Sequence, residues 1–257
     1  MRRRQILTLA RRSILGTIRQ PELIFPSLFF PLLFAALSVA SFNKAIHVLP
    51  GFHGVRTFLD FQLAATVVQG VLFGSTGGGN DMAVDIQDGF FDRLLASPVS
   101  RTAILLGRLA GTAVLGAFQA VLFIAILVAF GATIKGGIAA IIVIIVISSV
   151  LAVGVGGFAV ALALRTGSPE AVQASFPLFF ISLFLSSAFF PRETMHGWFK
   201  VVATINPLSW MVEALRHLVI EGFDAAAALR AVAIVLVICA VSISLSTMAL
   251  RARVAHA

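Results

Sequence analysis

The sequence predicts an all-α polytopic membrane protein with six transmembrane helices. Hydrophobic residues make up 59% of its 257 positions and charged residues only 12%, whereas soluble proteins average about 45–50% apolar and 25% charged residues. A chain of this length has room for about six apolar spans of around 20 residues with their connections. Each span is expected to be a helix, because lipid offers no partners to backbone N–H and C=O groups. We expect a single membrane domain over residues 1–257.

Residues 1–20 are predicted to form an amphipathic helix that lies in the membrane interface. Arginines interrupt the segment, so it lacks the unbroken apolar core of a secretion signal. The arginines are expected to lie among lipid headgroups. Pro21 ends the helix, because proline has no backbone N–H to continue it. The apolar face consists of four residues at helical spacing: Ile6, Ala10, Ile14 and Ile18.

Six apolar runs define the predicted spans. They are connected by one long charged loop, residues 81–101, and by one long mixed segment, residues 191–225. Prolines inside the first run are tolerated there, because membrane helices accommodate kinks. The runs cover residues 22–42, 58–80, 103–130, 138–164, 171–190 and 226–250.

Basic residues set the predicted orientation, since cytoplasmic loops carry an excess of Lys and Arg. With the N-terminus inside, 12 of the 19 basic residues lie on the cytoplasmic side and 7 on the outer side. Both termini are therefore expected to be cytoplasmic, in a bacterial-type cell membrane. The net charge of +8 is expected to face the anionic headgroups of the lipid bilayer rather than nucleic acid, because the arginines flank apolar runs.

The loop at residues 81–101 carries more charge than a connection between two spans requires. It combines four aspartates and two arginines with the apolar cluster Phe90–Leu95. An apolar centre within a charged rim is typical of protein interfaces. The loop is therefore predicted to be a docking element for a soluble partner at the membrane surface.

The outer segment, residues 191–225, is too polar to span the bilayer and too apolar for a solvated loop. Trp198 is expected to lie at the membrane interface. Pro207 forces Asn206 out of the helical region, so we expect two short helices that dip into the outer leaflet and return. The second of them carries three ionisable residues close enough in sequence to pair locally: Glu213, Arg216 and His217.

The sequence offers no signal for catalysis. It lacks the Gly-x-x-x-x-Gly-Lys-Ser/Thr loop that binds nucleotide phosphates. Its five histidines are scattered rather than placed at metal-ligand spacing, and Cys239 is the only cysteine. We therefore expect a protein that is not an enzyme and holds no cofactor or metal of its own.

Two spans carry polar stripes. Buried amides and hydroxyls in a membrane face either protein or water, so these residues either hydrogen-bond neighbouring helices or line a translocation path. The candidate path residues are Gln62, Thr66, Gln69, Phe73 and Thr76 in the second span, and Ser175, Ser182 and Ser186 in the fifth.

Two Gly-x-x-x-Gly pairs predict places where helices approach closely, because glycine has no side chain to hold them apart. Such a contact can join two helices of one chain or two copies of the chain. The pairs are Gly70 with Gly74 and Gly107 with Gly111.

The order of these parts resembles the membrane subunit of type-2 ATP-binding-cassette exporters. The resemblance covers nearly the whole chain and rests on three stretches. Arg19-Gln-Pro21 follows the basic helix and precedes the first span. Asp85-x-x-x-Gly89-x-x-Asp92-Arg93-Leu94-Leu95-x-x-Pro98-x-x-Arg101, followed by Leu106-Gly107-Arg108, matches the cytoplasmic loop. The outer segment matches at Ala188-Phe-Phe-Pro191, Met195, Trp198, Asn206-Pro207-Leu208 and Glu213-Ala-Leu-Arg216.

The resemblance implies that the charged loop holds a coupling helix that fits a groove on an ABC ATPase subunit. ATP and Mg would then bind to that separate chain, and hydrolysis there would drive alternating access. A second permease, identical or related, is implied as a further partner. The coupling residues carried over are Asp88, Gly89, Phe90, Phe91, Asp92, Arg93, Leu94, Leu95 and Pro98, with Phe90, Phe91, Leu94 and Leu95 as the apolar contacts.

The loop is similar to that of the daunorubicin-resistance-type drug exporters, although Gln87-Asp88-Gly89-Phe90 lacks the glutamate and threonine that flank this glycine in many relatives. A hydrophobic or amphipathic small molecule or lipid would be the solute, exported from the cytoplasm or the inner leaflet. A polysaccharide or glycolipid exporter is the first alternative. A non-ABC channel or a scaffold for membrane assembly is the second.

Overall fold

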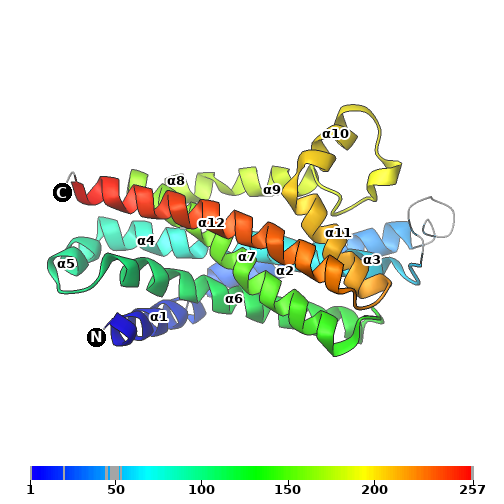
Figure 1. Ribbon diagram of the computed structural model, residues 1–257, viewed down its shortest axis with the longest axis horizontal. Coiled ribbons are helices and arrows are strands. Elements are labelled where there is room, and N and C mark those ends of the chain that lie inside the picture. Colours follow the sequence, from blue (N-terminus) through cyan, green and yellow to red (C-terminus); the bar gives the residue numbers. More distant parts are fainter. Residues whose placement is uncertain (1, 20, 44–45, 47–51, 53, 256–257) are drawn as a thin grey trace.

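The computed structural model describes residues 2–19, 21–43, 46, 52 and 54–255. Positions 1 and 20 of the predicted interfacial helix lie outside the described residues. Figure 1 shows an elongated bundle of helices. Both ends of the chain and the short helix α5 (Phe90–Ala96) lie at one end of the bundle, which we call the α5 end, and α10 (Gly197–Ile205) projects at the other, the α10 end. The regular structure of the described residues is entirely helical, which confirms the predicted fold class.

The remaining helices follow the predicted order. Among the described residues, five stretches are long and apolar enough to cross a membrane: Ile24–Phe42, Phe58–Gln87, Arg101–Ala129, Gly137–Thr166 and Ala225–Ala255. The helices other than α5 and α10 are α1 (Arg2–Ile18), α2 (Pro21–Phe42), α3 (Phe58–Gly74), α4 (Gly77–Gln87), α6 (Arg101–Ala129), α7 (Gly137–Thr166), α8 (Pro169–Ala174), α9 (Phe176–Phe184), the 3₁₀ turn η2 (Arg192–Thr194), α11 (Pro207–Ile220) and α12 (Ala225–Ala255).

The second span is longer than the predicted 58–80. It begins at the Thr57 cap, where Thr57 and Asp60 exchange side-chain-to-backbone hydrogen bonds, as in a capping box. After a short break at Ser75 and Thr76 it continues as α4 to Gln87. The charged loop therefore begins near Asp88 rather than at residue 81, and α4 holds the first two aspartates of the predicted loop.

The fifth span, predicted as one helix over residues 171–190, is broken. α8 ends before Ser175, and α9 begins with Pro177 in its first turn. Proline lacks a donor and clashes with the preceding turn, so it starts helices more readily than it continues them. α9 ends at Phe184, and residues 185–190 form turns and bends. In place of the fifth of the six predicted spans, the described residues form the shorter pair α8 and α9.

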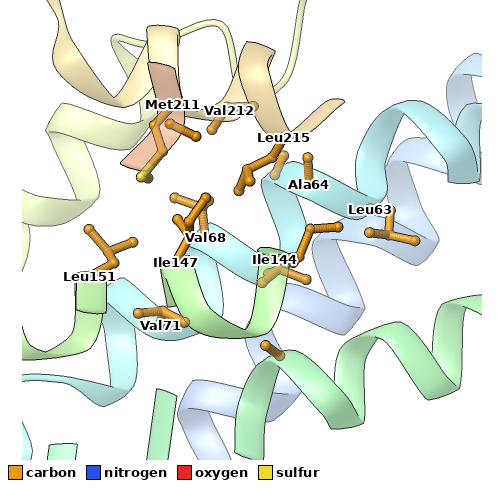
Figure 2. Packing of buried hydrophobic residues seen from close by; sticks show 14 of the residues in the cluster. Leu63, Ala64, Val68, Val71, Ile144, Ile147, Leu151, Met211, Val212 and Leu215 are labelled. Atoms are coloured by element: carbon orange, nitrogen blue, oxygen red, sulfur yellow. The ribbon is translucent and has the colours of Figure 1, made fainter. Parts of the chain in front are cut away.

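α3 lies at the centre of the bundle, and nearly all of its residues are buried. Apolar side chains of α3, α7 and α11 point toward one another in Figure 2 and form one core. α11 is therefore a structural element of the core, and the outer segment is more than a peripheral loop. The labelled residues of this core are Leu63, Ala64, Val68 and Val71 from α3, Ile144, Ile147 and Leu151 from α7, and Met211, Val212 and Leu215 from α11.

Both glycine pairs hold helices of the same chain together. A Cβ at Gly107 or Gly111 would overlap α1, at Leu9 and Ser13 respectively. The Ser13 hydroxyl also donates to the Arg108 carbonyl over 2.9 Å. The predicted close contacts are confirmed, and Gly107 and Gly111 let α1 lie directly against α6.

Gly70 gives a first testable prediction, because a Cβ there would overlap the ring of Phe123. Gly70→Ala is expected to lower the free energy of unfolding by about 1–3 kcal/mol, the usual cost of overpacking. Thermal unfolding in detergent measures the change. Adding Phe123→Leu should restore part of the stability, and Gly16→Ala, which meets no atom within 4 Å, should cost nothing. Equal stability of Gly70→Ala and the wild type would contradict this packing.

Candidate functional site

A sharp turn places α5 at the end of the bundle. Gly89 joins α4 to α5 with φ +68°, a left-handed conformation that other residues adopt only with strain. Nothing lies within 4 Å of a Cβ built on Gly89, so the backbone angle rather than space requires glycine. The Ser97 hydroxyl donates to the Leu94 carbonyl over 2.7 Å just beyond the end of the helix. A short helix is therefore present where the resemblance implied one, at Phe90–Ala96.

The predicted coupling residues point in different directions. Phe91 is completely buried, in an apolar cluster that includes Met82, Leu109 and Val172. Its side chain anchors α5 to the rest of the chain, so its prediction as a contact to a partner is wrong for this structure. The half-buried members are Gly89, Phe90, Leu94 and Leu95, and the exposed members are Asp88, Asp92, Arg93 and Pro98.

A charged cluster joins α1, α4 and α6 next to α5. Arg12 Nη2 of α1 lies 2.8 Å from Asp85 Oδ1 of α4. Arg108 of α6 pairs with both Asp85 and Asp81, with 3.3 Å between its Nη1 and Asp81 Oδ2. The Arg12 guanidinium also stacks over the Phe90 ring at 3.8 Å from the ring centre. One set of charged side chains therefore connects α1, α4, α6 and α5.

This cluster corrects the sequence-based interpretation of the loop. Asp81 and Asp85 were expected at an exposed docking surface, but Asp85 is 8% exposed and pairs with the largely buried Arg108 and the exposed Arg12. Arg108 was the signal that could have revealed the cluster. A cation within an apolar span is costly unless it is paired, so Arg108 required an acidic partner on a neighbouring helix.

The predicted path residues of α3 lie on one buried face. Gln62, Thr66 and Gln69 are 0% exposed. The amide N and O atoms of Gln62 and Gln69 have no hydrogen-bond partner among the described residues. Phe73 continues the face and packs against Phe176 of α9, with 4.9 Å between ring centres. This arrangement contradicts the alternative in which both amides hydrogen-bond neighbouring helices in this conformation.

Thr76 and the three serines do not extend this stripe. Thr76 is half-buried at the break between α3 and α4. Each serine hydroxyl donates to a nearby backbone carbonyl: Ser175 to Val172, Ser182 to Leu178 and Ser186 to Leu183. Ser182 is exposed and lines an apolar groove of about 880 Å³ that also touches α7 and α12, whereas Ser186 is buried. The path assignment itself stays a prediction.

Arg216 is a structural centre of the α10 end. It is 8% exposed. Its Nε donates to the Phe61 carbonyl over 3.2 Å, and its Nη2 donates to the carbonyls of Ser187 and Ala188 over 3.1 and 2.9 Å. Its guanidinium stacks on the Phe61 ring at 3.5 Å from the ring centre. One side chain thus ties α11 to α3 and to the turn that follows α9.

The predicted local pairing within α11 is wrong. Glu213 pairs with Arg192 of η2 rather than with Arg216 or His217. His217 Nε2 lies 3.0 Å from a carboxylate oxygen of Glu221. Local spacing could not indicate Arg192 as the partner of Glu213, because η2 comes from a separate part of the outer segment. The His217–Glu221 pair, in contrast, has the i, i+4 spacing of neighbours on one helical face.

The break at Asn206 and Pro207 is confirmed, since α10 ends before Asn206 and α11 starts with Pro207. Asn206 Nδ2 donates to the Ser182 carbonyl over 2.6 Å, and its Oδ1 accepts from the Leu208 N–H over 2.9 Å. Asn206 thereby fixes the outer segment to the end of α9. Trp198, on α10, is 71% exposed, as an interfacial anchor would be.

The apolar spans define a multi-pass membrane protein. The ABC-2 type transporter family model matches residues 4–220. The chain belongs to the ABC-2 type transporter family. This result confirms the resemblance described above and places the protein in a bacterial-type plasma membrane.

Individual relatives agree with the family assignment. The chain is 30% identical over 164 residues to the daunorubicin resistance ABC transporter permease protein DrrB1 of Streptomyces coeruleorubidus, a match that covers 63% of this chain and 57% of that protein. It is 27% identical over 216 residues to the "Putative transport permease ycf38" of Cyanophora paradoxa, covering 83% of this chain and 73% of that protein. The similarity to the daunorubicin-resistance branch is therefore confirmed, over little more than half the length of DrrB1.

Proposed function

We propose that this chain is the membrane-spanning permease of an ATP-driven exporter that moves a hydrophobic or amphipathic solute out of the cytoplasm or the inner leaflet. The observation that carries the proposal is α5. It presents exposed Asp92 and Arg93 at the end of the bundle while Phe91 holds it to the spans. Such a helix can transmit movement, because a push on its outer surface reaches the spans through a packed side chain.

An ABC ATPase subunit is the proposed partner of this surface. The exposed surface of α5 carries both negative and positive charge, and Leu94 and Leu95 lie half-buried beside these charges. Charged groups around a small apolar area give an interface its orientation, while the apolar area supplies binding energy. ATP and Mg would bind to that subunit. A second permease, identical or related, would complete the transporter.

The proposed solute class rests on two observations. The relative DrrB1 is named for resistance to daunorubicin. In addition, the groove beside Ser182 is lined almost entirely by apolar side chains from α7, α9, α10 and α12. Such a lining suits a hydrophobic solute better than a sugar. The groove and the buried face of α3 are the two regions of this chain proposed to meet the solute.

The first experiment is a pull-down from native membranes in mild detergent, with mass spectrometry of the captured proteins. The wild-type chain is expected to retain an ABC ATPase. The variant Asp92→Lys/Arg93→Glu should lose it while remaining folded, because both residues are exposed and the net charge is unchanged. Capture should fall by about 100-fold or more, since a reversed charge pair at an interface costs several kcal/mol.

A matched variant controls for charge reversal alone. Glu193→Lys/Lys200→Glu reverses two exposed residues at the α10 end and should retain the ATPase. Absence of any ATPase from the wild-type sample, under conditions that preserve other membrane complexes, would refute the coupling assignment and favour a channel or a scaffold. Solute uptake into inverted vesicles that requires both ATP and the captured ATPase would then test export itself.

A further inference from the structure

A basic cavity of about 790 Å³ lies between α1, α4 and α6 at the α5 end. Its lining includes four arginines and two aspartates: Arg11, Arg12, Arg19, Arg108, Asp81 and Asp85. The cavity therefore carries an excess of positive charge. No part of the proposed coupling surface or of the candidate path accounts for it.

The positive charge in the cavity is only partly neutralised. Arg12 and Arg108 pair with the two aspartates. In contrast, neither Arg11 nor Arg19 has an ion pair or a side-chain hydrogen bond to the residues that the structure describes. Two guanidinium groups are thus available to an anion, and arginine binds phosphate oxygens with paired N–H donors.

A neutral donor and two apolar side chains complete the cavity. Asn80 Oδ1 accepts from Gln173 Nε2 over 3.2 Å, which leaves the NH₂ group of the Asn80 amide free to donate to an anion. Leu15 and Val84 line the same cavity and are 39% and 38% exposed. Apolar surface next to free arginines suits a molecule with an anionic head and an apolar body.

We propose that this cavity binds the phosphate headgroup of an anionic phospholipid, with Arg11 and Arg19 as its charged contacts. α1 is amphipathic and exposes Leu7, at 68%, next to Arg11 in the helical repeat, as expected for a helix at the level of the headgroups. Basic pockets between membrane helices are suited to anionic headgroups. The second copy of the permease and the ATPase are not needed for this site.

Lipid in the cavity would also act on α5. Arg12 lines the cavity, pairs with Asp85 and stacks on Phe90. A phosphate close to Arg11 and Arg19 repels the Asp85 carboxylate and attracts Arg12, so it changes the contacts that hold Phe90. The bound lipid would therefore alter the mobility of the helix proposed to meet the ATPase.

Native mass spectrometry of the purified full-length chain in nonionic detergent tests the site. Dioleoyl phosphatidylglycerol is titrated first, with dioleoyl phosphatidylcholine and inorganic phosphate as competitors. The wild type is expected to bind phosphatidylglycerol saturably. Arg11→Gln/Arg19→Gln should weaken this binding about 30-fold, the effect of removing two basic contacts near a membrane surface.

The control variant is Arg165→Gln/Arg251→Gln, which removes two exposed arginines from outside the cavity and should bind phosphatidylglycerol like the wild type. Equal loss in both variants would overturn the site in favour of general charge attraction. Competition by inorganic phosphate at concentrations that leave other bound lipids in place would overturn the lipid assignment in favour of a free phosphate site.

Amide hydrogen exchange over residues 90–96 tests the link to α5. Phosphatidylglycerol should change the exchange of this helix in the wild type and leave it unchanged in Arg11→Gln/Arg19→Gln. Saturable binding without any change in exchange would overturn the link.

Discussion

Arg216→Met is expected to lower the stability of the chain more than any other single change considered, by about 3–5 kcal/mol, because hydrogen bonds to a charged group contribute roughly 1.5–3 kcal/mol each and removing the buried charge offsets part of their loss. The guanidinium donates to three backbone carbonyls, of Phe61, Ser187 and Ala188. Methionine has a similar length and is apolar, so it fills the space but supplies no donor. The three carbonyls would lose their bonds together with the stacking on Phe61.

Thermal unfolding of the purified chain in detergent measures this effect. Arg230→Met is the matched control, because the Arg230 side chain is 66% exposed and lies 4.0 Å from Asp224. An exposed pair of this kind contributes about 0–1 kcal/mol, so the control should unfold close to the wild type. Similar unfolding of Arg216→Met and Arg230→Met would show that the carbonyl contacts of Arg216 do not stabilise the fold.

Arg216 also shows what the sequence could indicate and what it could not. Apolar runs and the Asn206–Pro207 break predicted the elements on either side of it, because these features depend on local residues. Its partners lie 155, 29 and 28 positions away in the chain. Only the tertiary structure brings them together. A backbone carbonyl acceptor cannot be recognised in a sequence, because every residue has one.

The α5 end gives a second example. The turn at Gly89 and the helix after it follow from local sequence, and both are present. The direction of the Phe91 side chain depends on how α4 and α6 pack around it. The apolar sequence Phe90–Leu95 alone therefore could not show which of its residues is buried in the bundle and which lie at the surface. Arg108 and Asp85 are 23 positions apart and were assigned to different elements, so their pairing was not predicted, although a cation in a span requires a partner.

The two buried glutamines of α3 lead to the second prediction. An unpartnered buried polar group costs about 1–3 kcal/mol, so Gln62 and Gln69, 0% exposed and without partners, destabilise the conformation described here. This cost disappears in a conformation that exposes the same face to water or solute. The polar face would then favour opening during transport.

Gln62→Leu/Gln69→Leu is therefore expected to raise the stability of the purified chain while it lowers transport. If leucine stabilises the closed conformation by about 1 kcal/mol at each position, the population of the open conformation falls roughly 30-fold, and ATP-dependent uptake into vesicles should fall with it. Thermal unfolding and vesicle uptake are measured on the same preparation. If this face of α3 lines the path, the double variant should show higher stability in thermal unfolding and lower uptake into vesicles.

Gln119→Leu provides the contrast, because the Gln119 NH₂ group donates to the Ser27 hydroxyl over 2.9 Å, while its Oε1 has no partner among the described residues. Loss of this hydrogen bond offsets the gain from removing the unpartnered oxygen, so Gln119→Leu should not raise stability as the double variant does and should not lower transport selectively. A double variant of Gln62 and Gln69 that is less stable than the wild type would instead mean that both amides hold the helices together. Higher stability with unchanged uptake would mean that this face of α3 never opens to the solute, and the path would then have to follow the apolar groove beside α9.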